Sequence, residues 1–210
     1  MTGMAIKDIE LAKIDEDTRD IGKYERHLET AASLGVKNVI TNIWTTHEEA
    51  YTETFAALCD MAARYGITVN LEFVTWAKVP ALSGARRIID AVGKPNARIL
   101  LDMLHFYRSR VAMEELDACP EGLIGPIHIC DAPPEIPTDE PSLIHTGRAA
   151  RLYPGDGAVD IAGIIKRLKG DAVFGIEIPS AEMVERIGPT EHVRRCLVRT
   201  KEYLAANGVV

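Results

Sequence analysis

Short apolar segments alternate with longer segments of helical periodicity along this chain, and the alternation strongly limits the folds it can adopt. The apolar segments are rich in Ile, Val and Leu; they are Ile6–Ile14, Val36–Asn42, Thr68–Phe73, Arg98–Asp102, Gly125–Cys130 and Val173–Ile178. Parallel strands need a crossover, usually a helix, to reach the next strand. The pattern therefore predicts an α/β fold in which βα units form a sheet of about six parallel strands.

Residues that start and stop helices stand between these segments. Thr46 with Glu49 three residues later is typical of a capping box. Other expected helix starts are Ser83, Asp160 and Thr190, and the expected ends are Gly35, Gly66, Gly93, Gly170 and Gly208. The segment Ala132–Gly157 is rich in Pro and Gly and shows no regular pattern. We interpret it as a long loop over a functional site.

The composition limits the classes of protein to which the chain can belong. Its 210 residues are 47% hydrophobic, which suits one compact domain over residues 1–210. The net charge of −7 disfavours a nucleic-acid partner, which needs clustered Lys and Arg. We find no secretion signal and no apolar run long enough to span a membrane, so we expect a cytoplasmic protein without a membrane partner. The cysteines are far apart, and we expect reduced, buried thiols: Cys59, Cys119, Cys130 and Cys196.

Four of the predicted strands carry an ionisable residue at or near the carboxyl end. These residues are Glu72, Asp102, His128 and Glu177. A lone residue of this kind is more often a strand-end polar group or an ion-pair partner. Since parallel strands point their carboxyl ends to one face, however, four in succession predict a shared cation. Three carboxylates and an imidazole favour Mn²⁺, Mg²⁺ or Co²⁺, with Zn²⁺ less favoured without a thiolate.

At these residues the sequence resembles the sugar phosphate isomerase/epimerase family with the xylose isomerase-like TIM barrel. The resemblance runs from Ile6 to about Leu204. It includes Asp102-Met-Leu-His105 and the segment Arg148-Ala-Ala-Arg151-Leu-Tyr-Pro154-Gly-Asp-Gly157, in which Asp156 replaces the commoner Glu. The resemblance implies a (β/α)8 barrel and a single divalent metal ion, for which we take Mn²⁺ first.

The resemblance also implies roles for individual side chains. Glu72 and Glu177 would return and remove a proton through an enediolate, in addition to binding the metal. His105 and Arg151 would hydrogen-bond substrate oxygens, with Arg148 as the alternative to Arg151. Trp76 would wall the pocket, although core packing explains it equally well. Asn42 and Trp44 follow the second predicted strand and are weaker candidates for the same cavity.

The function implied is a metal-dependent isomerase or epimerase of a small sugar, keto-acid or polyol. A dehydratase of the same superfamily and a non-catalytic metal- or sugar-binding protein are the alternatives. An endonuclease is disfavoured, because such sites hold several metals with more His ligands beside a basic groove. The sequence has no Gly-rich phosphate loop, which favours a substrate without phosphate.

The resemblance also implies that two βα units are missing. The four ligand strands correspond to the last four of the barrel and Ile6–Ile14 to the third, so nothing supplies the first two. The chain is then a fragment from a late gene start, a short form completed by a second copy, or an open six-stranded fold. Because exposed parallel edges invite pairing, we expect a homo-oligomer.

Overall fold

The described part of the chain contains six strands, and each strand is followed by one or more helices. The computed structural model describes residues 3–16, 18, 20–170 and 172–209. The strands follow one another in the sheet in their order along the chain, from β1 to β6. This is the strand order of a (β/α)8 barrel. The chain divides into two compact units, Met1–Leu100 and Leu101–Val210.

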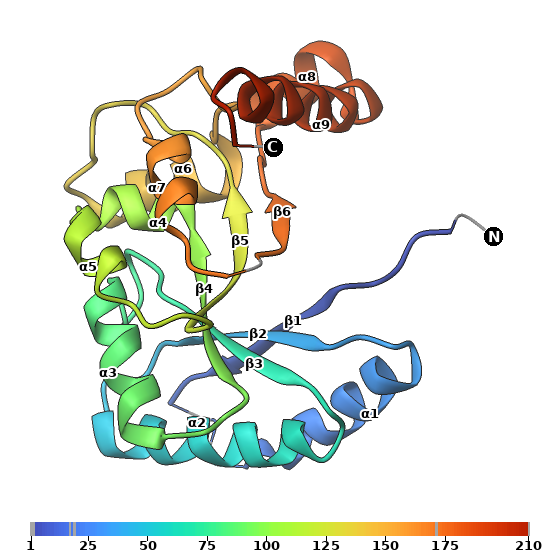
Figure 1. The fold of residues 1–210 in the computed structure, drawn as a ribbon, viewed down its shortest axis with the longest axis vertical. Coiled ribbons are helices and arrows are strands. Elements are labelled where there is room, and N and C mark those ends of the chain that lie inside the picture. The colour runs from blue at the N-terminus through green and yellow to red at the C-terminus, as the bar shows by residue number, and fades with distance from the viewer. Residues whose placement is uncertain (1–2, 17, 19, 171, 210) are drawn as a thin grey trace. The chain divides into compact units, whose positions relative to one another are not determined.

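The first unit holds three complete βα repeats and the start of the fourth strand (Figure 1). Its elements are β1 (Asp8–Ile14), the 3₁₀ turn η1 (Ile21–Tyr24), α1 (Glu25–Ser33), β2 (Asn38–Ile43), α2 (Glu48–Ala63), β3 (Thr68–Glu72), α3 (Leu82–Val92) and β4 (Ala97–Asp102). Neighbouring strands from β1 to β4 pair in parallel. The apolar face of α2, with Phe55, Leu58 and Ala62, is fully buried. The packing of α2 against β3 and α3 explains why this face is apolar.

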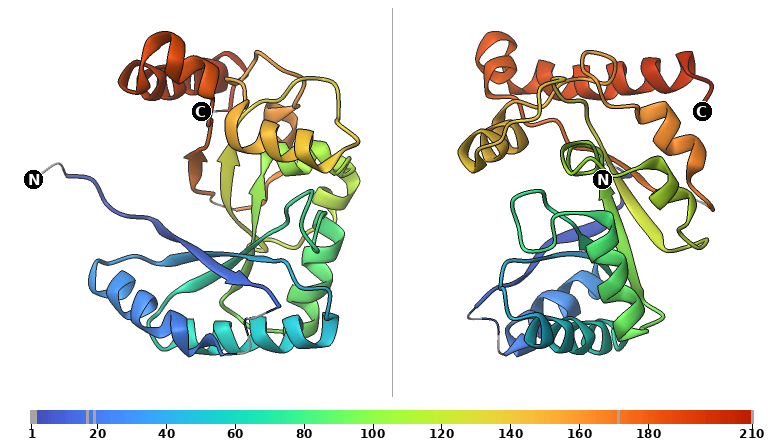
Figure 2. Two further views of the ribbon diagram at one scale, coloured as in Figure 1. Left: turned by 180° about the vertical axis from the view of Figure 1, so that it is seen from behind. Right: turned by 90° about the vertical axis from the view of Figure 1, so that its left-hand side faces the viewer.

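The second unit holds the last two strands and most of the short helices. Its elements are α4 (Met103–Arg108), α5 (Met113–Asp117), β5 (Ile124–Ile129), α6 (Glu140–Ala149), α7 (Ile161–Arg167), β6 (Phe174–Ile176), α8 (Ala181–Ile187) and α9 (Pro189–Ala206). Strands β5 and β6 pair in parallel. Helices α8 and α9, in red, lie side by side in every view (Figures 1 and 2). One stripe of α9 is buried at four-residue spacing: His192, Cys196, Thr200 and Leu204.

The predicted strands are confirmed, with differences at their ends. Each of the six predicted segments overlaps one observed strand. The largest difference is in Val173–Ile178, where strand β6 spans only Phe174–Ile176. Strand identity was predictable because β-branched and Leu residues cluster where both faces of a strand are covered.

Three of the predicted helix starts are wrong and one is confirmed. Helix α2 begins after His47 rather than with the capping box at Thr46, whose backbone N–H is bonded to Glu16. Ser83 lies inside α3, which begins at Leu82. Helix α9 begins at Pro189, not at Thr190, because proline at a first helical position has the required φ and needs no N–H partner. Asp160 caps α7 as predicted, accepting a bond from Gly163 N.

The interpretation of Ala132–Gly157 as a structureless loop is wrong. Ten of its residues form α6, Glu140–Ala149. Asp139 caps this helix by accepting a 2.9 Å bond from Ser142 N. Pro141 would break the interior of a helix, but it lies in the first turn, where a helix tolerates proline.

The burial of the cysteines agrees with the sequence-based expectation. All four cysteines are free thiols and buried. In residues 3–16, 18, 20–170 and 172–209, no helix is both long and apolar enough to cross a membrane.

Candidate metal centre

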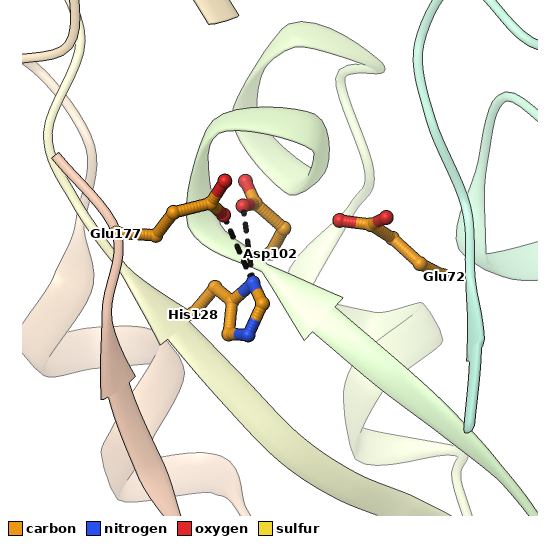
Figure 3. A group of neighbouring side chains, drawn as sticks. All are labelled: Glu72, Asp102, His128 and Glu177. Atoms are coloured by element: carbon orange, nitrogen blue, oxygen red, sulfur yellow. Dashed lines mark hydrogen bonds and ion pairs between the residues drawn. The ribbon is translucent and has the colours of Figure 1, made fainter. Parts of the chain in front are cut away.

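Three of the four predicted ligands come together in the unit Leu101–Val210. Asp102 is the last residue of β4, His128 lies in β5, and Glu177 directly follows β6. The backbone N–H of Glu177 is bonded to Ile129 O on β5, which fixes the carboxylate beside His128. Each residue offers one potential ligand atom, and these atoms lie within 4.8 Å of one another (Figure 3). This is the convergence expected where parallel strands end at one edge.

The buried Arg151 guanidinium joins this cluster. Its Nη1 lies 2.6 Å from Asp102 Oδ2 and 3.2 Å from Glu177 Oε2. His128 Nδ1 lies 2.9 Å from the same Glu177 oxygen and 3.9 Å from Asp102 Oδ2. Two carboxylates, an imidazole and a guanidinium therefore lie in direct contact with one another. The side chain of Glu177 is 41% exposed, whereas that of Asp102 is fully buried.

Asp102 uses its two oxygens for different purposes. Oδ1 accepts bonds from Leu104 N at 2.8 Å and His105 N at 3.1 Å, so it caps α4. Oδ2 faces His128 and Arg151. Burial raises the pKa of Asp102, but the Arg151 guanidinium more than reverses this and holds the pKa well below its usual range. The carboxylate is therefore ionised, as a metal ligand must be.

His105 stands in the first turn of α4 and is 3% exposed. Burial lowers its pKa to about 4, since the attraction of Asp102 only partly offsets burial and the charge of Arg151. The imidazole is therefore neutral near pH 7 and can either donate or accept a hydrogen bond. This suits the predicted contact with substrate oxygens.

Of the two arginines considered from the sequence, only Arg151 lies in the cluster. Arg148 is an exposed residue of α6. Arg151 is 4% exposed, and its Nε donates to Gly147 O at 2.9 Å. Its Nη1 also lies 3.4 Å from Cys130 Sγ. Burial raises the pKa of Cys130 to about 12, so this thiol is neutral.

Asp131 was not assigned a role from the sequence, yet it organises the loop that follows Arg151. Its buried carboxylate accepts four backbone bonds of 2.8–3.0 Å, which come from Ala132, Gly155, Gly157 and Val159. A Cβ at position 157 would lie 2.3 Å from Ala132 O, so the loop requires glycine there. The only sequence signal was an aspartate directly after a buried strand, followed later by the Pro-Gly-Asp-Gly turn.

His192 on α9 supports the end of β6 in a way the sequence did not reveal. Its Nε2 lies 2.8 Å from Ile178 O, next to Glu177. A carbonyl only accepts, so Nε2 carries the proton and Nδ1 accepts from the Tyr153 hydroxyl at 2.8 Å. The buried imidazole thus ties α9, the segment after Arg151 and the Glu177 strand together. In the sequence, His192 looked like any residue on a buried helix face.

Glu72 belongs to the first unit, Met1–Leu100, where it ends β3 and is half-buried. Asn42 Nδ2 lies 3.5 Å from Glu72 Oε2. Trp44 Nε1 donates to Asn42 Oδ1 at 2.6 Å, which turns the amide N–H₂ toward Glu72. Trp76, four residues beyond Glu72, is half-buried.

Comparison with known proteins adds a family and a fold. The family model described as "Xylose isomerase-like TIM barrel" matches residues 1–200. The chain is 29% identical over 162 residues to an inosose isomerase from Bacillus velezensis, covering 71% of this chain and 55% of that protein. It is 28% identical over 162 residues to an inosose isomerase from Bacillus subtilis, with the same coverage. The chain thus spans about half the length of the curated relatives it matches.

Solved structures share the architecture at lower identity. A crystal structure of the IOLI protein with a bound zinc atom superposes with a TM-score of 0.82 at 22% identity, over 96% of this chain and 77% of that one. The 3-keto-D-glucoside 4-epimerase YcjR from E. coli gives a TM-score of 0.69 at 18% identity, over 96% and 80%. Likeness at these identities shows the TIM-barrel fold, of which the described residues of this chain contain six strands.

Proposed function

Because the chain belongs to the xylose isomerase-like TIM barrel family, we propose that it is a metal-dependent isomerase or epimerase of a small sugar-like substrate. The inosose isomerases among its relatives support an inosose or a related sugar, keto-acid or polyol. The observation that carries the proposal is the convergence of Asp102, His128 and Glu177 at the carboxyl ends of three strands. Because the chain spans about half the length of those relatives, their activity comes to it as a proposal, and we propose that residues 1–210 form a single domain of this family.

We assign the metal to Asp102, His128 and Glu177, with Glu72 as fourth ligand. Glu72 ends the strand next to β4, and its Cα pairs with that of Leu100, two residues before Asp102. Three carboxylates and one imidazole fit a divalent cation, and we take Mn²⁺ first. The zinc atom of the IOLI structure supports a divalent ion without fixing its identity here. The bound ion would polarise a substrate carbonyl and stabilise negative charge on the enediolate oxygens.

The chain's own side chains would move the proton. We assign removal of the proton on the substrate carbon to Glu177, because its side chain is 41% exposed and its carboxylate is oriented by His128. Glu72 would return the proton, and Asn42, held by Trp44, would orient its carboxylate. The neutral His105 and the cationic Arg151 would hydrogen-bond substrate oxygens, and Trp76 would wall the pocket.

The first test is the metal content of the purified chain beside its Glu177→Gln variant. We expect one divalent ion per chain in the unaltered protein and at least a tenfold weaker Mn²⁺ affinity in the variant, about 1.4 kcal/mol or more. Glu185→Gln, which alters an exposed acid on α8, is the matched control and should keep the affinity. The proposal fails if neither protein binds Mn²⁺, Mg²⁺, Co²⁺ or Zn²⁺.

Metal binding alone would also fit a non-catalytic protein, so a second measurement addresses catalysis. Incubation of the Mn²⁺-loaded chain with an inosose in D₂O should place deuterium on the substrate carbon, as followed by proton NMR. A product that has lost water would instead identify a dehydratase. Metal binding without deuterium exchange for any ketose tested would favour the binding-protein alternative.

A further inference from the structure

A cavity lined by arginines adjoins the ligand cluster within the unit Leu101–Val210. Its volume is about 480 Å³, within the range of small-molecule sites. Ser180 and Arg151 form part of its wall, and Arg151 is the residue that contacts Asp102 and Glu177. Helices α8 and α9, which lie side by side in Figure 2, provide the other arginines: Arg186, Arg194, Arg195 and Arg199.

Arginines outnumber acids around this cavity, although the chain as a whole is negative. Among the described residues that line it, five are arginines and only Asp156 and Glu182 are acids. The chain as a whole has a net charge of −7. Arginines gathered around one cavity of an acidic protein therefore form a local site for negative charge.

Ion pairs hold these guanidinium groups in place and leave donors available. Glu191 accepts bonds of 2.7–2.8 Å from Nε and Nη2 of Arg194 and from Nε of Arg195. In the described part of the chain this is the only side-chain bond of Arg195, so both of its terminal N–H₂ groups remain available. Asp156 holds Arg199 Nη2 at 2.5 Å. Guanidinium groups fixed in this way lose little freedom when they bind a ligand.

The positive charge reaches the inner wall of the cavity. Tyr153 lines the cavity and is buried, and the Arg199 guanidinium lies over its ring at 5.8 Å. Burial raises the pKa of Tyr153, while Arg195, Arg186 and Arg199 act to lower it. Three arginines from two helices thus lie close enough to the buried Tyr153 hydroxyl to favour a negative charge there.

We propose that this cavity binds an oxyanion, the phosphate or carboxylate group of a small molecule. Guanidinium forks match both groups through paired N–H donors. The expectation of a substrate without phosphate considered only Gly-rich loops, and side chains on α8 and α9 bind an anion by different chemistry. That the anion is a substituent of the metal-bound substrate rests on the proposed function, whereas anion binding itself does not.

The test is titration of the metal-free full chain with inorganic phosphate at low ionic strength, followed by calorimetry. The double variant Arg195→Gln/Arg199→Gln should bind phosphate about tenfold more weakly or worse, since hydrogen bonds to charged groups are lost. Arg167→Gln is the matched control, because Arg167 is 40% exposed and paired with Asp117, much like the 41% exposed Arg199. If the double variant is poorly folded by circular dichroism, the single Arg195→Gln variant replaces it. Equal affinity in variant and control, or no binding to the unaltered chain, overturns the proposal.

A second arm identifies the source of the anion and separates this proposal from the metal proposal. Glu177→Gln removes a negative charge beside Arg151, so it should not weaken phosphate binding even if it loses the metal, and failure of one proposal leaves the other measurable. Fructose 6-phosphate is then titrated with and without Mn²⁺. Affinity that rises with Mn²⁺ assigns the phosphate to a substrate spanning both sites. Affinity independent of Mn²⁺ but lowered by the double variant assigns the cavity to a separate anion.

Discussion

At the scale of a single residue, the neutral, buried His105 makes the free energy of unfolding depend on pH. Its pKa is about 4 in the folded chain and 6.5 ordinarily, so below pH 6.5 the unfolded chain takes up a proton that the folded chain does not. The free energy of unfolding should therefore fall as pH falls from 6.5 to 4, by on the order of 3 kcal/mol at most, and then level off. Urea unfolding of the metal-free chain between pH 6.5 and 4 measures this change in the free energy of unfolding.

The control for this pH dependence is His105→Gln, which cannot titrate. Its free energy of unfolding should change less than that of the unaltered chain over the same range. If both proteins lose the same stability, the acid dependence arises from other groups and the neutral state of His105 is not its cause.

At the scale of an element, α7 depends on its cap. Asp160 Oδ1 accepts a 2.9 Å bond from Gly163 N at the start of this seven-residue helix. Asp160→Ala should lower the free energy of unfolding by about 1 kcal/mol, because the helix start loses its acceptor. Asp160→Asn, which keeps an oxygen acceptor, should restore most of this loss in urea unfolding. An alanine variant as stable as the unaltered chain would contradict the role of the cap.

The elements also show why some features were predictable and others were not. Strands were found because apolar β-branched residues mark them, and Asp102, His128 and Glu177 were grouped because each stands near the carboxyl end of a strand. Helix α6 was missed because Pro141 is a breaker inside a helix but a normal residue in its first turn. The roles of Asp131 and His192 depend on partners 14 to 39 residues away, which no local pattern encodes.

At the scale of the whole molecule, exposed apolar side chains predict self-association. Along β6, α8 and α9 a groove of about 690 Å³ is bordered by apolar side chains that are 36–67% exposed: Ile176, Val184, Val193 and Leu197. We expect a homo-oligomer above the 23.1 kDa of one chain in light scattering. Val193→Asp should shift it toward the monomer, whereas Ala57→Glu on the exposed face of α2 should not. A monomeric unaltered chain at micromolar concentration would contradict this.

The four backbone hydrogen bonds to Asp131 have a consequence for the local opening of this turn. Because one carboxylate holds the amides of Gly155, Gly157 and Val159, none of them can be released without disturbing the acceptor of the others. Opening of this turn is therefore a single cooperative event. The three amides should show one common protection factor in hydrogen–deuterium exchange, and Arg151, four residues before Gly155, would be held or freed with them.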